Sequence, residues 1–529
     1  MKNVFEKILI VLLAVFVLSA SACSEIQYVA DDISEPEQTE SAGSEEKIPE
    51  ESSPVSGGRL MLTSGAYSSL NPLTTDNEDI KQYMNLVYGS IVSLDYDMSP
   101  KAELAESWSC DEECRVWTFN FRSGITWHDG SSFDAKDAAA TIEYIKSVGG
   151  NYSENVANID KCTAQSESVL VVECKEPDGM LTCKMAIPVI KSESLKSSTA
   201  NTLPIGTGMY KYNTYESMAS KICLERNDMY YGNIPYIESV EINVYADEEQ
   251  RSSGEFDFSM LYDTAFSSEF AKEGSKSANF SGSIFMCLLP NISKKSVMND
   301  ANIRHAVSCF SDRSNIINAA AAGNAESALL PAYKGTFCWQ DDGVIDSADA
   351  ASGETYMKNA GYTKSDSGLW NIGGKNLELT CIVPADFVEH ELLALKLKDE
   401  LEKQGISVNN VILDEKLYAD ALKSGSYDLA IMEIKLGSWI DLESVFSKDG
   451  ELNINVYSNE QLETLFDNVA ATSDSAAVSD MYRQIKEILL EDMPIIGLYI
   501  KNSTVVSSFR LWNVATSGIY TWDIFANID

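Results

Sequence analysis

Apolar residues recur along this chain at the spacings of strands and helices from Gly57 onward. The stretch 117–121 places Trp or Phe at every second position, with polar residues between them, which is the period of a half-buried strand. Asp134, with Asp137 three residues later, is typical of a helix N-terminus, and the helical spacing continues to about residue 145. The pattern predicts a globular body without an internal repeat.

The second half of the chain alternates predicted strands with predicted helices. Five elements follow in the order strand, helix, strand, helix, strand, at 377–383, 390–403, 408–413, 416–422 and 427–432. That order predicts a parallel α/β sheet, because parallel strands need a crossover that a helix usually supplies. Other strands are expected at 59–63, 169–172, 222–227, 239–245 and 494–499, and other helices at 80–92, 302–322, 462–469 and 480–490, with Arg304, Asp312 and Arg313 on the polar side of helix 302–322.

Composition narrows the classes of function. The chain has 529 residues and a formal net charge of -40 at pH 7. Its length predicts more than one hydrophobic core. Nucleic acid and anionic lipid both require clustered Lys and Arg, so the acidic balance argues against either as a direct partner. Only three His are present, which argues against a His-rich metal centre and against a multi-His active site.

Residues 1–22 have the pattern of an export signal. Two Lys accompany the apolar run Ile8–Leu18, which is too short to span a membrane comfortably. Small residues then lead into Cys23, similar to a bacterial lipoprotein signal, although Ala20 stands where Leu is most usual. If that similarity holds, Cys23 carries a diacylglycerol thioether that anchors the protein on the extracytoplasmic face of the cell membrane. The alternative is an ordinary secretory signal in which Cys23 is incidental.

Residues 23–56 form a predicted acidic, disordered tether. Ten Asp and Glu stand against one Lys between 24 and 56, and Ser and Pro fill much of the rest. Such a segment cannot bury enough apolar surface to offset the entropy of ordering, and its like charges extend it. The folded body is therefore expected to float off the membrane surface.

The cysteines fit an exported protein. Eleven are present, and ten remain once Cys23 is set aside for a lipid. The ends of two predicted hairpins place Cys110 with Cys114 and Cys162 with Cys174, so a disulfide is expected in each. The alternative is that the thiols are simply buried. A zinc site would need a second Cys or His pair at matching spacing, so no metal is predicted.

Several short motifs occur in an order that resembles the family 5 extracellular solute-binding proteins, the oligopeptide-, dipeptide- and nickel-binding components of ABC importers. The match runs from about 57 to 515. Met209 is a departure, since the family has Pro there. The motifs are Gly58-Arg59-Leu60, Leu70-Asn71-Pro72-Leu73, Ala102 to Trp108, Trp117 to Gly130, Phe133 to Asp137, Pro204 to Tyr210, Asn302 to Ala306 and Ser311-Asp312-Arg313.

This resemblance implies an α/β, two-lobed periplasmic-binding-protein-like fold (type II, cluster C) with an extra domain inserted in the first lobe. Solute binds between lobes that close about a hinge, and the liganded, monomeric receptor docks on ABC permease subunits. No cofactor is implied, and His128 is expected to hold a hairpin through a backbone hydrogen bond. The expected bounds are 57–90, 204–265 and 495–529 for the first lobe, 91–203 for the inserted domain and 266–494 for the second lobe.

The resemblance also indicates where a solute is held. Peptide-binding members pair the peptide's amino group with an Asp, and here Trp439 stands at that position while Asp441 lies two residues on. Asp441 either binds a cationic group with Trp439 as its face, or caps the short helix that follows. The loop after the first strand supplies the other edge, with Tyr67, Ser68 and Asn71 as candidate contacts. Tyr67 either stacks on solute or covers the lobe edge.

Three classes of function compete. The first is an import receptor for a peptide or similar small solute. The second is a signalling or chaperone-like surface lipoprotein of the same fold. The third, an exported enzyme, lacks support because the sequence contains no Gly-x-Ser-x-Gly elbow, no His-Glu-x-x-His helix and no phosphate-binding Walker loop.

Overall fold

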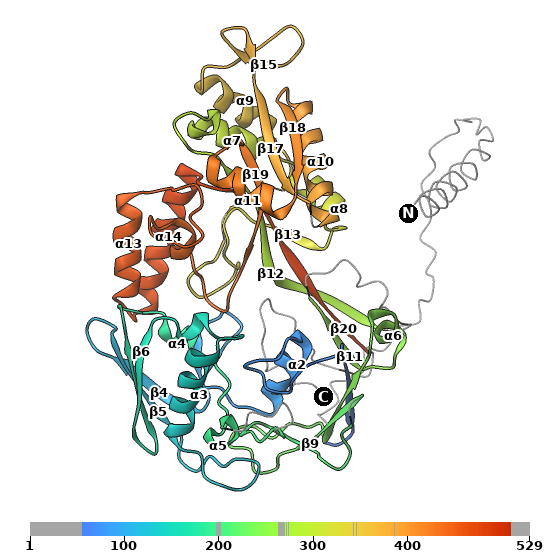
Figure 1. The fold of residues 1–529 in the computed structure, drawn as a ribbon, viewed down its shortest axis with the longest axis vertical. Coiled ribbons are helices and arrows are strands. Elements are labelled where there is room, and N and C mark those ends of the chain that lie inside the picture. The colour runs from blue at the N-terminus through green and yellow to red at the C-terminus, as the bar shows by residue number, and fades with distance from the viewer. Residues whose placement is uncertain are drawn as a thin grey trace, which may run out of the picture. The chain divides into compact units, whose positions relative to one another are not determined.

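A computed structural model describes residues 56–508 and 511, apart from 197–202, 219, 263–269, 271, 273–274, 342, 345 and 386 (Figure 1). The chain divides into two units, 1–53 and 54–529, and the described residues all belong to the second. The predicted signal, Cys23 and nearly all of the predicted tether lie outside the described residues. Within the described ranges, no helix is both long enough and apolar enough to cross a bilayer.

One large sheet runs through the molecule, with strand order β18-β17-β19-β12-β20-β11-β1-β10-β9-β8, and β13 pairs with β20. We call the β11-to-β8 end the first lobe and the β18-β17-β19 end the second lobe. β12 and β20 are shared by both lobes and are called the crossing strands. The strands are β1 (Arg59–Ser64), β8 (Tyr210–Tyr212), β9 (Lys221–Arg226), β10 (Ser239–Val244), β11 (Phe258–Leu261), β12 (Lys276–Pro290), β13 (Ala325–Ser327), β17 (Glu378–Pro384), β18 (Ser407–Leu413), β19 (Leu429–Lys435) and β20 (Ile496–Ser507).

The second lobe has the predicted parallel arrangement, because β17 pairs in parallel with both β18 and β19. Apolar residues of one group of helices form one core on this part of the sheet, and those of a second group contribute to another. The first group is α7 (Ala301–Phe310), α8 (Arg313–Ala320), α9 (Ala350–Asn359) and α10 (Val388–Lys403), and the second is α11 (Glu415–Ser424), α13 (Glu460–Ala470) and α14 (Ser475–Asp492). Figure 1 shows α13 and α14 as an adjacent pair.

A separate four-stranded antiparallel sheet, with order β4-β5-β7-β6, belongs to the inserted domain. Trp117, Phe119 and Phe121 on β5 are all buried, as their alternation predicted. The predicted helix start is also confirmed, since Asp134 and Asp137 form a reciprocal capping box. The elements are β4 (Ala105–Cys110), β5 (Val116–Phe121), β6 (Ile159–Ser166), β7 (Val169–Cys174), α3 (Ala135–Val148) and α4 (Leu181–Lys184).

Two predicted helices differ from the structure. The helix expected over 302–322 is two helices, α7 and α8, broken at Ser311 and Asp312, because the Asp312 carboxylate accepts the Asn315 N–H and caps α8. Arg304 and Arg313 are buried rather than exposed, and their guanidinium groups bond backbone carbonyl oxygens. The helix expected over 80–92 is limited to α2 (Glu78–Tyr83) and a short 3-10 turn.

The hairpin that carries His128 is held to the crossover at Gly206 and Gly208 by backbone hydrogen bonds, as expected. His128 Nε2 lies 3.0 Å from the Gly208 carbonyl oxygen, and the Gly206 N–H donates to Nδ1 at 3.2 Å. Burial lowers the pKa of His128 to about 4. A Cβ on Gly206 would lie 1.8 Å from the Val87 carbonyl oxygen, so only glycine permits this approach.

Neither predicted disulfide is formed, since all ten described cysteines are free thiols. Cys110 Sγ and Cys114 Sγ are 3.3 Å apart, in contact but well beyond the length of about 2.05 Å for an S–S bond. In the β6–β7 ladder, Cys162 faces Val172, and Cys174 faces a different residue. Cys162 and Cys174 are thus diagonal neighbours, and diagonal pairs are usually too far apart to bridge.

Candidate functional site

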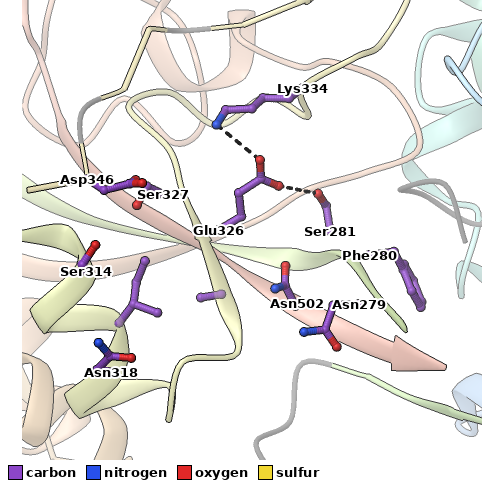
Figure 2. A pocket seen from close by; sticks show the side chains of 12 residues that line it. Asn279, Phe280, Ser281, Ser314, Asn318, Glu326, Ser327, Lys334, Asp346 and Asn502 are labelled. Carbon is purple, nitrogen blue, oxygen red and sulfur yellow. Dashed lines mark hydrogen bonds and ion pairs between the residues drawn. The ribbon is translucent and has the colours of Figure 1, made fainter. Parts of the chain in front are cut away.

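The crossing strands β12 and β20 position a cavity of about 660 Å³. Because β12 and β20 join the two lobes, a molecule bound in this cavity contacts the strands that connect the lobes. The ladder has a register shift between Ser281 and Phe285, where β12 bulges opposite β20. We call this space the crossing-strand cavity (Figure 2). Its lining residues are Asn279, Phe280, Ser281, Ser314, Ile317, Asn318, Ala325, Glu326, Ser327, Lys334, Asp346 and Asn502.

The charged groups of this cavity are partly paired with each other. Lys334 Nζ lies 3.2 Å from one carboxylate oxygen of Glu326, and the Ser281 hydroxyl donates to the other at 3.3 Å. Figure 2 shows Glu326 held between these two partners. The remaining polar lining consists mainly of carboxamides and hydroxyls. None of the five solute contacts expected from the sequence lines this cavity.

The loop after β1 contains Tyr67, Ser68 and Asn71 on the first lobe. The Ser68 amide and hydroxyl both donate to Asp76, which lowers the pKa of that carboxyl group. The Asn71 side chain accepts the Leu73 N–H at 2.9 Å, so Asn71 shapes its own turn. Tyr67 is half-buried against the core of the first lobe, and burial raises the pKa of its hydroxyl.

On the second lobe, Asp441 makes a hydrogen bond to the short helix that follows it. Its carboxylate accepts the Ser444 N–H at 3.1 Å in the first turn of α12 (Glu443–Phe446), from one residue before the N-cap position, Leu442. Asp441 remains exposed. Burial and the nearby Asp441 charge raise the pKa of Glu443.

The face of Trp439 is occupied by a cation from the protein itself. Lys184 Nζ, from α4 of the inserted domain, lies 5.6 Å from the centre of the Trp439 ring. The same ammonium group is 2.7 Å from the buried carboxylate of Asp178. Lys184 occupies the position at which the sequence analysis expected the amino group of a solute. No sequence motif indicated this contact between Lys184 and Trp439. Among the described residues, no hydrogen bond, ion pair or ring contact joins Trp439 or Asp441 to the loop that carries Tyr67.

The contact between the inserted domain and the second lobe extends well beyond this lysine, and we call it the seam. Met98, Met180 and Cys183 of the inserted domain pack within an apolar core made mainly by the second lobe and the crossing strands. The Gly179 N–H donates to the Ala470 carbonyl oxygen at the end of α13, at 2.7 Å. In this structure the inserted domain therefore contacts the second lobe directly.

Comparison with known proteins identifies the family to which the chain belongs. A model of the bacterial extracellular solute-binding proteins, family 5, matches residues 99–447, which is more than half of the chain. The chain belongs to this family. It is therefore a solute-binding protein of the kind that serves ABC importers, and the family is periplasmic or extracellular.

Full-length relatives support the assignment. The oligopeptide-binding protein AppA of Bacillus subtilis (strain 168) is 22% identical over 479 residues, covering 85% of this chain and 87% of AppA. The probable D,D-dipeptide-binding periplasmic protein DdpA of Escherichia coli (strain K12) is 22% identical over 464 residues, covering 82% and 86%. The nickel ABC transporter structure from Bacillus halodurans aligns with a TM-score of 0.73 at 21% identity, covering 87% of this chain and 97% of that one. This structural likeness shows the two-lobed fold.

Within the described ranges, no three His, Cys, Asp or Glu side chains gather in a way that could hold a metal ion. Cys110 Sγ lies 3.3 Å from Cys114 Sγ and 3.3 Å from the hydroxyl of Ser473 in the second lobe. The polar groups of the two sites described above are amides, hydroxyls, paired charges and the carboxylates of Asp346 and Asp441.

Proposed function

We propose that this protein is an extracytoplasmic receptor that captures a peptide or similar small solute and delivers it, unchanged, to the permease of an ABC importer. The family assignment carries this proposal. Both full-length relatives named above are described as peptide-binding proteins, at 22% identity. That level of identity leaves the solute itself open to experiment.

Capture occurs by closure of the two lobes about the crossing strands. Closure is a shift between open and closed populations, and a solute favours the closed one only if it contacts both lobes. β12 and β20 are the only strands of the large sheet, among those described, that belong to both lobes. Changes in their twist are therefore the mechanical route for closure.

The solute is held between the loop after β1 and the segment after β19. Tyr67, Ser68 and Asn71 form the first-lobe edge, and Trp439 with Asp441 forms the second. Because Lys184 lies against Trp439, a solute amino group reaches that ring only by displacing the lysine. Asp441 is exposed and retains one carboxylate oxygen that the cap of α12 does not use.

A lipid on Cys23 holds the receptor at the membrane, and the acidic segment 23–56 is its tether. A double-chain anchor keeps the receptor in reach of the permease, which raises its effective concentration there. Replacing Cys23 by Ser should move the protein from the membrane fraction to the medium or periplasm. Retention of C23S in the membrane fraction would contradict the anchor.

The receptor function is tested by two measurements. Native mass spectrometry of protein purified without refolding should reveal a co-purified solute, and deletion of the gene should abolish uptake of that solute. Asp441→Asn keeps an oxygen for the α12 cap but removes the charge, whereas Asp441→Ala removes both. Weaker binding in both variants supports the charge contact, and unchanged binding in Asp441→Asn reduces Asp441 to a cap. Absence of any bound solute together with unimpaired peptide uptake would refute the receptor function.

A further inference from the structure

We propose that the crossing-strand cavity is a second binding site, selective for a small uncharged polyhydroxylated solute such as a sugar. This inference goes beyond the receptor function and does not depend on the residues assigned to the solute there. Its volume, about 660 Å³, falls within the range of about 300–1,000 Å³ that small-molecule sites occupy. The chemistry of its lining determines the class of ligand.

Three asparagines supply neutral hydrogen-bonding groups. The side chains of Asn318 on α8 and Asn502 on β20 make no hydrogen bond to any described residue, yet both line the cavity. Asn279 on β12 accepts the Thr504 hydroxyl at 2.8 Å through its carbonyl oxygen, which leaves its amino group to donate. A carboxamide both donates and accepts, as a hydroxyl does, so these groups match a polyol.

The charges of the cavity disfavour an anion and a peptide zwitterion. Lys334 is already paired with Glu326, and Glu326 is also bonded by Ser281. A peptide would bring two charged termini, each of which needs an opposite charge, and an anion would face Glu326 and Asp346. An uncharged solute needs no such partner. Phe280 adds an apolar ring to a lining that is otherwise mostly polar, as sites for ligands with one apolar face require.

The position of the cavity links its occupancy to the arrangement of the lobes. Most of its lining comes from β12, β20, β13 and α8, so an occupant contacts both crossing strands and second-lobe elements together (Figure 2). An occupant that fits one arrangement of these elements better than another shifts the balance between the arrangements. Occupancy of this cavity therefore couples to the relative position of the lobes.

The test uses the full chain and ligand-observed NMR with glucose, maltose and the dipeptide Ala-Ala as probes, each at about 10 mM. We expect glucose or maltose to bind with a Kd below about 1 mM. Asn318→Leu and Asn502→Ala should each weaken that binding about tenfold, as expected for loss of a hydrogen bond to the solute. Asn318 is exposed on a helix, so its replacement should leave folding intact. Asn233→Leu, at an exposed asparagine away from the cavity, is the matched control.

Three results would overturn the proposal. They are failure of both sugars to bind the wild-type chain below about 1 mM, sugar binding that neither Asn318→Leu nor Asn502→Ala weakens, and preference of the cavity for Ala-Ala over the sugars. Loss of sugar binding in Asn318→Leu with co-purified solute unaffected supports a second site. The receptor function is judged separately, by co-purified solute and uptake in the wild-type chain, so its failure is distinguishable from failure of this second site.

Discussion

Replacing Gly179 by Ala tests whether the seam controls lobe closure. Gly179 donates its N–H to the Ala470 carbonyl oxygen at 2.7 Å. A Cβ at this position would lie 2.0 Å from the Thr472 carbonyl oxygen and 2.5 Å from that of Val469. These atoms belong to the backbone at the end of α13, so they cannot rotate away as a side chain would. The methyl group must push the inserted domain off the second lobe.

The size of the effect follows from two contributions. Overpacking a close contact costs about 1–3 kcal/mol, and loss of the hydrogen bond costs about 0.5–1.5 kcal/mol. Together they give about 1.5–4.5 kcal/mol, which is roughly a 10- to 2,000-fold shift in an equilibrium. If the seam must part for the lobes to open, Gly179→Ala favours the open form by this factor. The affinity for a solute that needs closure falls with it.

Small-angle X-ray scattering of the unliganded protein and calorimetric titration with the co-purified solute measure the two consequences. We expect Gly179→Ala to increase the radius of gyration and to weaken solute binding. Gly437→Ala is the control, because a Cβ there meets only the Trp439 ring at an ordinary 3.7 Å. If Gly179→Ala and Gly437→Ala give the same scattering curve and the same affinity as wild type, the seam has no part in closure.

Other predictions concern single interactions. Lys184→Met leaves the buried Asp178 carboxylate without its 2.7 Å partner, so chemical denaturation should show a loss of about 3 kcal/mol, and adding Asp178→Asn should restore part of it. His128 has a pKa of about 4 when folded, against about 6.5 unfolded, so its contribution is complete above pH 6.5 and is lost as the pH falls towards 4; His128→Gln should flatten that slope in urea titrations. Oxidised glutathione should join Cys110 to Cys114, with two protein thiols oxidised as one oxidised glutathione is reduced to two glutathione molecules. After gel filtration removes the glutathione, an Ellman assay should show two fewer protein thiols; Cys114→Ser should prevent formation of this disulfide, and unchanged protein thiol counts in wild type would contradict it.

Local patterns predicted much of the fold because they report on local physics. The alternation at 117–121 requires one buried face whatever else surrounds it, and the Asp134 capping box satisfies its own helix. Prediction failed where tertiary contacts decide. Arg304 and Arg313 were placed on a polar face, but both are buried because backbone carbonyl oxygens accept from their guanidinium groups. No periodicity records such long-range acceptors.

The sequence predicted less of the candidate site than of the fold. The motifs located the loop with Tyr67 and the segment with Asp441, since each follows a recognisable strand. They gave no sign that Lys184 covers Trp439, because those residues come from separate domains. The crossing-strand cavity is assembled from residues between Asn279 and Asn502, and its asparagines belong to no shared motif. Only the fold brings them together.

The order of strands in the large sheet has a consequence for how this protein is made. β20 ends at Ser507, close to the end of the described chain, yet it lies between β11 of the first lobe and β12. Neither half can complete its backbone pairing until this late segment has been synthesised. A nascent or exported chain that emerges N-terminus first therefore waits, with strand edges unpaired, for nearly its whole length. Such a chain should depend on holding chaperones during secretion, and truncation before β20 should yield aggregation rather than a stable first lobe.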